Sequence, residues 1–89
     1  MKEFQLQIVT PEGVLFEGAA EQLSVRSIDG ETAILAGHIP YVTALAKGDC
    51  RVYTGGNVRT AACGGGLLSV NNEKTTLLSP DFHWTESKK

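Results

Sequence analysis

The sequence predicts an all-β protein: a two-sheet antiparallel β-sandwich of about eight to ten short strands, followed by a short C-terminal tail. Ten glycines and three prolines divide the 89 residues into short pieces, which leave little room for a long helix. Apolar and polar residues alternate with a period of two, as in half-buried strands. Turn residues recur at roughly the 8–12-residue spacing that is typical of sandwiches and small barrels.

In the first half of the chain the alternation predicts four strands. They cover residues 4–9, 14–18, 23–26 and 33–35. Pro11-Glu12-Gly13 predicts the turn between the first two strands, because proline and glycine favour turn conformations. Asp29-Gly30 predicts a hairpin turn between the last two. The residues that follow, Ala36–Pro40, are expected to form an irregular loop.

The second half is dominated by two predicted hairpins. Gly55-Gly56-Asn57 joins residues 50–54 to 58–63, and Asn71-Asn72-Glu73 joins residues 67–70 to 74–78. Before the first hairpin, residues 41–46 fit either a strand or a single helical turn, and 47–49 predict a turn. Gly64-Gly65-Gly66 lacks the lysine of a phosphate-binding loop and precedes a strand, so it predicts a bulge or a close backbone approach.

The chain is long enough for one domain with a single core. A protein of 9.5 kDa buries roughly 60% of its extended surface on folding. We therefore predict one sandwich domain over residues 1–80. Residues 81–89 lose the alternation and predict a tail that docks through Phe82 and Trp84 and frays beyond them.

Charge and hydropathy disfavour several classes of protein. The net charge of −2 and the pI of about 5.6 disfavour a nucleic-acid binder, which usually carries a basic patch. No apolar run approaches the ~18 residues of a transmembrane helix. The first residues, Met1–Gln5, lack the apolar stretch of a signal peptide, so secretion by that route is not expected.

The residues that usually carry catalysis are few. No Gly-x-Ser-x-Gly occurs, and His38 and His83 show no metal-ligand spacing. Cys50 and Cys63 are too few for a zinc or disulfide framework, and we predict buried, reduced, poorly reactive thiols. A hairpin turn at Gly56-Asn57 would put them directly opposite each other, and a turn shifted by one residue would misalign them. The sequence thus predicts no catalytic residue, no cofactor and no bound metal.

Three stretches carry motifs at a specific spacing. They are Leu6–Gly18 with Val-Thr-Pro-Glu-Gly, Asp29–Pro40 with Asp-Gly-Glu and Gly-His-x-Pro, and Gly65–Val70. Together they resemble the epsilon subunit of F-type ATP synthase, from about Phe4 to Ser79. The resemblance implies two stacked antiparallel sheets and no catalytic residues. It also implies a place in the rotating central stalk, where the domain joins the gamma subunit to the membrane-embedded c-ring.

The resemblance also implies two sets of interface residues. The c-ring set is Asp29, Gly30 and Glu31. The gamma contacts of the family match Thr10, His38 and Thr43 here, and we add the neighbouring Tyr41 to complete the gamma set. We expect Glu31 to be exposed in the isolated domain and to face a basic c-ring residue in the complex. The gamma set should share one surface, and the turns at 29–31 and 37–40 should lie at the same end of the sandwich.

This sequence departs from the family pattern in three places. Many members continue into a C-terminal helical hairpin that inhibits ATP hydrolysis, and this sequence stops at Lys89 without one, so we expect the inhibitory function to be absent. Ala36 stands where family members usually have proline. Phe82-His83-Trp84 replaces the acidic, alanine-rich segment that usually follows the sandwich in the family.

The expected location is the cytoplasmic face of the bacterial inner membrane, or the stromal side of the thylakoid, with membrane association only through the complex.

Two other functions remain open from the residues alone. One is a free-standing sandwich that binds a peptide or a sugar, and the other is a small metal or thiol enzyme. Co-purification with gamma and the c-ring would separate the stalk subunit from a free module, and elemental analysis would reveal a metal.

Overall fold

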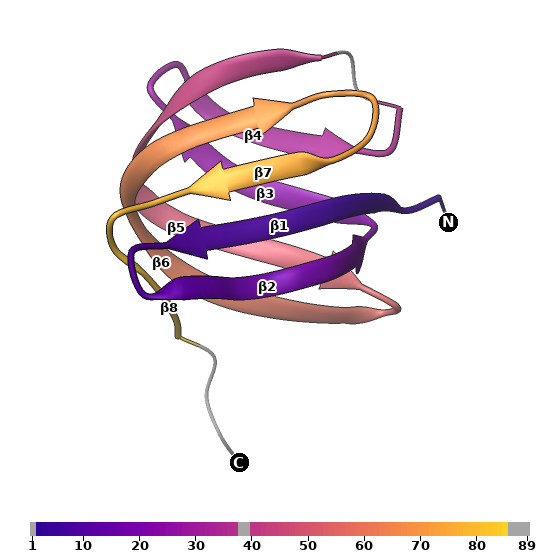
Figure 1. The fold of residues 1–89 in the computed structure, drawn as a ribbon, viewed down its shortest axis with the longest axis horizontal. Helices are drawn as coiled ribbons and strands as arrows, with labels where there is room; N and C mark the ends of the chain where they lie inside the picture. Colours follow the sequence, from indigo (N-terminus) through magenta and orange to yellow (C-terminus); the bar gives the residue numbers. More distant parts are fainter. Residues whose placement is uncertain (1, 38–39, 86–89) are drawn as a thin grey trace.

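The computed structural model describes residues 2–37 and 40–85, and these form eight strands (Figure 1). The strands are β1 (Phe4–Thr10), β2 (Gly13–Ala20), β3 (Gln22–Ser27), β4 (Gly30–Leu35), β5 (Tyr41–Thr54), β6 (Asn57–Val70), β7 (Thr75–Leu78) and β8 (Phe82–Trp84). Their order in the sheet is β2-β1-β7-β6-β5-β3-β4, and β8 also pairs with β6. The predicted all-β fold is confirmed.

One continuous sheet makes both layers of the sandwich, because β5 and β6 are each 14 residues long and belong to both layers. The end of β6 pairs with β7, whereas its middle pairs with β8. β5 pairs with β3 over residues 51–53 and, after a shift in register, again at Leu45↔Ser27. Figure 1 shows the two long strands curving round one end of the molecule, which folds the sheet back onto itself.

The bend is built around the glycines of β6. Gly65 and Gly66 have φ angles of 101° and 133°, in the region that side-chain-bearing residues avoid. A Cβ on Gly66 would overlap the Leu78 carbonyl oxygen and lie 2.9 Å from the Ser79 Cα. Before the bend Ala61 and Cys63 point inward, and after it Leu68 and Val70 do, so the inward face changes from odd to even residues. The close backbone approach predicted for this glycine run is confirmed.

The core lies between the two layers. Its largest fully buried side chains are Leu6, Ile8, Leu23, Ile34, Leu68, Leu77, Val52 and Cys50. They come from strands of both layers at alternate positions, as the period-two pattern predicts. Burial of such side chains is the main favourable contribution to the free energy of folding of a domain of this size.

The structure corrects several local predictions. The turn expected at 47–49 does not form, because β5 continues through it in register with β6, from Lys47↔Gly64 to Asp49↔Ala62. Residues 41–46 are strand rather than a helical turn. β2 continues past Gly18 to Ala20, since Gly18 pairs with Leu6 in the regular stretch of the β1–β2 ladder from Phe4↔Ala20 to Ile8↔Phe16. The sheet is also not purely antiparallel, because β1 and β7 are parallel.

The C-terminal segment includes a strand that the alternation did not reveal. β8 has three residues, too few for a recognisable period, and pairs Phe82 with Cys63 and Trp84 with Ala61. Phe82 is buried, and the Trp84 ring meets Phe82 and Phe16 edge to face at centroid distances of 5.4 and 6.3 Å. Residues 86–89 lie outside the described part of the chain. The division between a domain ending at 80 and a tail stays a prediction.

Candidate partner interface

A row of apolar side chains crosses the outer face of one layer. Its members, one from each of five neighbouring strands, are Val14, Val9, Leu78, Leu67 and Ala44, and we call them the apolar row. Each is the cross-strand partner of the next in the sheet register. They point outward because their chain neighbours, such as Leu68 and Leu77, are fully buried on the inner face.

Much of the apolar row is exposed. Val14, Leu67 and Leu78 have 51%, 42% and 44% of their surface in solvent. Two further exposed apolar side chains lie beside Ala44. Val42, two residues earlier in β5 and paired with Ser69 of the neighbouring row, is 62% exposed. Ile28, whose N–H donates to the Ala44 carbonyl over 3.1 Å, is 67% exposed. Contiguous exposed apolar surface on a small domain marks an interaction site, whereas isolated apolar residues do not.

A shallow hollow of about 380 Å³, wide open to solvent and called the notch below, lies over the middle of the apolar row. Its lining is Val9, Thr10, Pro11, Gly66, Leu67, Leu78, Ser79 and Pro80. The neighbouring row on the same outer face is polar, with Gln7, Thr76 and Ser69 in register. The outer face therefore changes from apolar to polar two residues along β1, β7 and β6, whereas in β5 the corresponding position, the partner of Ser69, is the apolar Val42.

The predicted c-ring residues lie at the turn between β3 and β4. The Ser27 hydroxyl donates to the Gly30 carbonyl over 2.9 Å and accepts from the Asp29 N–H over 3.2 Å, which ties the turn together. Glu31 is exposed, as predicted, but it lies 3.5 Å from the Arg26 guanidinium of its own chain. A basic group on a partner would therefore meet an already paired carboxylate.

The predicted gamma residues are only partly brought together. Tyr41 and Thr43 share one side of β5 with the buried Leu45. Thr10 is on β1, three strands away, and its hydroxyl donates to the Gly13 carbonyl over 3.3 Å within the β1–β2 turn. His38 lies outside the described residues. Both segments instead lie beside the apolar row. Thr10 follows Val9 in β1, and Tyr41 and Thr43 flank Val42 in β5.

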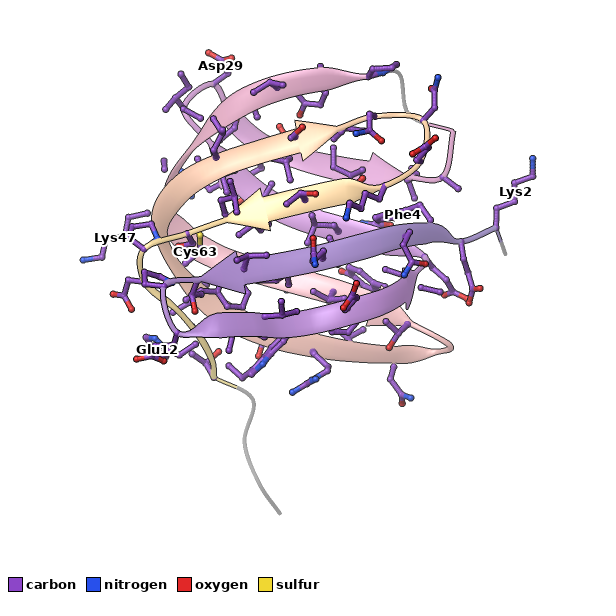
Figure 2. The ribbon with its side chains drawn as sticks, viewed as in Figure 1. Lys2, Phe4, Glu12, Asp29, Lys47 and Cys63 are labelled. Atoms are coloured by element: carbon purple, nitrogen blue, oxygen red, sulfur yellow. The ribbon has the colours of Figure 1, made fainter. Side chains whose placement is uncertain are left out.

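The two turns that were expected at one end of the sandwich lie at opposite ends. β4 runs from Gly30 to Leu35, so the 29–31 turn and Gly37 are separated by the length of that strand. In Figure 2 Asp29, Glu12 and Lys47 mark one end of the molecule and Phe4 the other. The expectation, which came from the resemblance, was wrong because the extended strand β4 carries the chain from one end of the sandwich to the other between the two turns.

The apolar row itself was missed by sequence reasoning, although a signal for it exists. Ile8-Val9, Leu67-Leu68 and Leu77-Leu78 are apolar doublets that break strict alternation. In a strand, two consecutive apolar residues occupy both faces of the sheet. Three doublets on three neighbouring strands therefore indicate an outer face that is apolar as well as an inner one.

The two cysteines are buried in the core as free thiols. The hairpin turns at Gly55-Gly56, so Cys50 pairs with Ala61 and Cys63 with Gly48, and the two are offset instead of opposite. Burial, and secondarily the neighbouring Cys63, raises the pKa of the Cys50 thiol to about 12.

Within 2–37 and 40–85, no three metal-ligating side chains gather into a possible metal site. No described segment is a helix long and apolar enough to cross a membrane.

Comparison with known proteins identifies the family. Residues 3–85 match the family model of the ATP synthase delta/epsilon chain β-sandwich domain. The chain belongs to this family. The family is that of a non-catalytic subunit of the ATP synthase complex. The match favours an ATP synthase subunit over the free-standing binding module and the small enzyme that the residues alone left open.

Relatives of the chain are ATP synthase epsilon chains from bacteria. The chain is 44% identical to that of Caldicellulosiruptor saccharolyticus over 86 residues, which covers 97% of this chain and 63% of the relative. It is 40% identical to that of Bacillus pumilus over 79 residues, covering 89% and 60%. The chain thus spans about three fifths of the length of these relatives.

Solved structures share the fold at low sequence identity. A chain in the cryo-EM structure of the Euglena gracilis mitochondrial ATP synthase superposes with a TM-score of 0.86 at 24% identity, over 92% of this chain and 53% of its own. A chain in the central stalk and c-ring structure of the Tetrahymena thermophila enzyme gives 0.78 at 10% identity, over 92% and 66%. These likenesses establish the sandwich fold.

Proposed function

We propose that this chain is a non-catalytic central-stalk (rotor) subunit of an F-type ATP synthase. It joins the gamma subunit to the c-ring and so couples ion translocation to ATP synthesis. Family membership and the names of its relatives support this proposal. The protein acts at the cytoplasmic face of the bacterial inner membrane, or on the stromal side of the thylakoid, and meets the membrane only through the complex.

The observation that carries the proposal is the apolar row. A rotor subunit without catalytic residues must transmit torque through contact, and a contact of this kind needs a well-packed apolar centre with a polar rim. The apolar row beside the polar row of Gln7, Thr76 and Ser69 has that arrangement. We assign this face to the gamma subunit and the β3–β4 turn to the c-ring.

Val42→Asp should weaken binding of the purified gamma subunit by roughly three- to tenfold, because it places a charge beside the apolar row. Titration calorimetry measures the dissociation constant. Val58→Asp is the matched control, since Val58 is 49% exposed but lies at the start of β6, away from the row. Equal affinities of the two variants would contradict the assignment of this face.

Glu31→Gln should change c-ring association only slightly, by about 0.2–1 kcal/mol, because exposed charges contribute little in water. The Glu31 side chain is 73% exposed and already paired with Arg26. Sedimentation with c-ring vesicles at low and high salt measures the effect, which should shrink as salt rises. A large loss that persists in high salt would show that Glu31 is buried in the complex.

A further inference from the structure

β8 is held along one edge only. It has three residues, and among the described strands it pairs with β6 alone, at the lower edge of the molecule in Figure 1. The Gly64 N–H donates to the Asp81 carbonyl over 2.7 Å at one end of this short ladder. The Thr85 N–H donates to the Thr60 carbonyl over 2.9 Å at the other end. A segment with so few partners needs less free energy to open than the rest of a sheet.

The chain just before β8 is fixed to the body of the sandwich. The Ser79 N–H donates to the Val9 carbonyl over 3.0 Å, which holds this segment against β1. The Ser79 hydroxyl donates to the Asp81 carbonyl over 2.9 Å and accepts from the Asp81 N–H over 3.2 Å. Pro80 lies between them and restricts the backbone further. The chain can therefore swing away only from Asp81 onward.

Asp81 lies directly against bare backbone of β6. A Cβ on Gly64 would be 2.9 Å from the Asp81 Cβ and 3.2 Å from the Asp81 carbonyl oxygen. Gly64 is not one of the glycines with a positive φ, so the close approach, and not the backbone conformation, requires glycine here. Any side chain at position 64 would push Asp81, and β8 with it, away from β6.

Aromatic side chains hold the far end of β8. Phe82 is buried, and the Trp84 ring meets Phe82 and Phe16 edge to face. The Arg59 guanidinium carbon lies 3.9 Å from the centroid of the Trp84 ring, within reach of a cation–π contact. Phe16 belongs to β2, the strand at one edge of the sheet order. Trp84 therefore joins the edges of the two layers.

β8 covers one of the two thiols. Phe82 is the partner of Cys63 in the register, and Cys63 is 5% exposed. The Cys63 thiol donates to the Ser79 hydroxyl over 3.7 Å, close to the fixed end of the segment. Cys50 lies on β5, one strand further from this edge, and is fully buried. Release of β8 would uncover Cys63 and leave Cys50 covered.

We propose that β8 is a releasable strap. It leaves the edge of β6 and returns to it, pivoting at Asp81, while the rest of the sheet stays folded. In the closed state Phe82 and Trp84 seal the edge of the sandwich. In the open state residues 61–63 lose their main-chain partners and both rings enter solvent. A contact that engages either ring elsewhere shifts the equilibrium toward the open state.

The strap is tested by alkylating the folded protein at pH 8 and measuring the rate at each thiol by mass spectrometry. Cys63 should react about tenfold or more faster than Cys50, because it needs only local opening. Its rate should change little in urea below the unfolding transition, since release of β8 exposes little surface. The rate of Cys50 should rise with urea in step with global unfolding. One urea dependence shared by both thiols would overturn the strap.

Two variants release the strap from its opposite ends. Gly64→Ala displaces Asp81 and should speed the reaction of Cys63 by about tenfold or more. Trp84→Ala removes the contact with Phe16 and should speed it by about fivefold or more. Trp84 pairs with Ala61 and not with Cys63, so this effect requires β8 to leave as a unit.

The matched control is Gly18→Ala, which should stay within about twofold of the unmodified chain because a Cβ there meets no atom within 4 Å. If Cys63 reacts no faster in Trp84→Ala than in this control, the strap is overturned, whether or not Gly64→Ala folds.

Discussion

Replacing Gly66 by alanine should destabilise the domain by at least about 3 kcal/mol, a large part of the 5–15 kcal/mol that typically stabilises a small domain. Two causes act together. The φ of 133° is strained for any residue with a Cβ, and that Cβ would overlap the Leu78 carbonyl oxygen and crowd the Ser79 Cα at 2.9 Å. Both obstacles are backbone atoms, so relief requires β6 and β7 to separate.

Urea denaturation followed by tryptophan fluorescence measures this loss, since Trp84 reports on the packing of β8. The matched control is Gly18→Ala in β2. No atom outside its chain neighbours lies within 4 Å of a Cβ built there, and its φ is ordinary. This control should change the free energy of unfolding by less than about 0.5 kcal/mol. A Gly66→Ala protein as stable as the control would mean that the bend does not require a residue without a Cβ at position 66.

The Cys50 thiol should react with a disulfide reagent about a thousandfold more slowly at pH 8 in the native protein than in the denatured chain. Only the thiolate attacks, and raising the pKa from 9.0 to about 12 lowers the thiolate fraction by that factor. Cys63, which is 5% exposed, should also label slowly because the reagent cannot reach it. Stopped-flow absorbance with and without urea measures both rates. Fast native labelling of either thiol would restore the thiol-enzyme hypothesis.

The same pKa shift predicts how stability changes with pH. Below about pH 9 the Cys50 thiol keeps its proton in the folded and unfolded chains, so it contributes no pH dependence. Between pH 9 and 12 only the unfolded chain loses the proton. Stability therefore falls through this window by up to about 1.4 kcal/mol per pH unit. Cys50→Val, which cannot titrate, should show a shallower decline. Identical slopes for the two proteins would contradict the shift.

Local chemistry was enough to predict most of the strands and turns. Period-two alternation placed the inward residues of β1 and β3, and the Gly55-Gly56 and Asn71–Glu73 turns lie in the predicted hairpins. These features depend on neighbours in the chain, and the side chains themselves encode them. The family also follows from motifs that are local in sequence. β8 was not predicted as a strand, because three residues are too few to show a period of two.

The tertiary structure alone decided how distant strands meet. Parallel pairing of β1 with β7 joins Val9 to Leu78, residues whose alignment no local pattern specifies. The apolar row, the notch and the offset between Cys50 and Cys63 all follow from such registers and from the bend at Gly66. A one-residue shift in register moves a side chain to the other face of the sheet, so long-range pairing determines which apolar residues are buried and which stay on the surface.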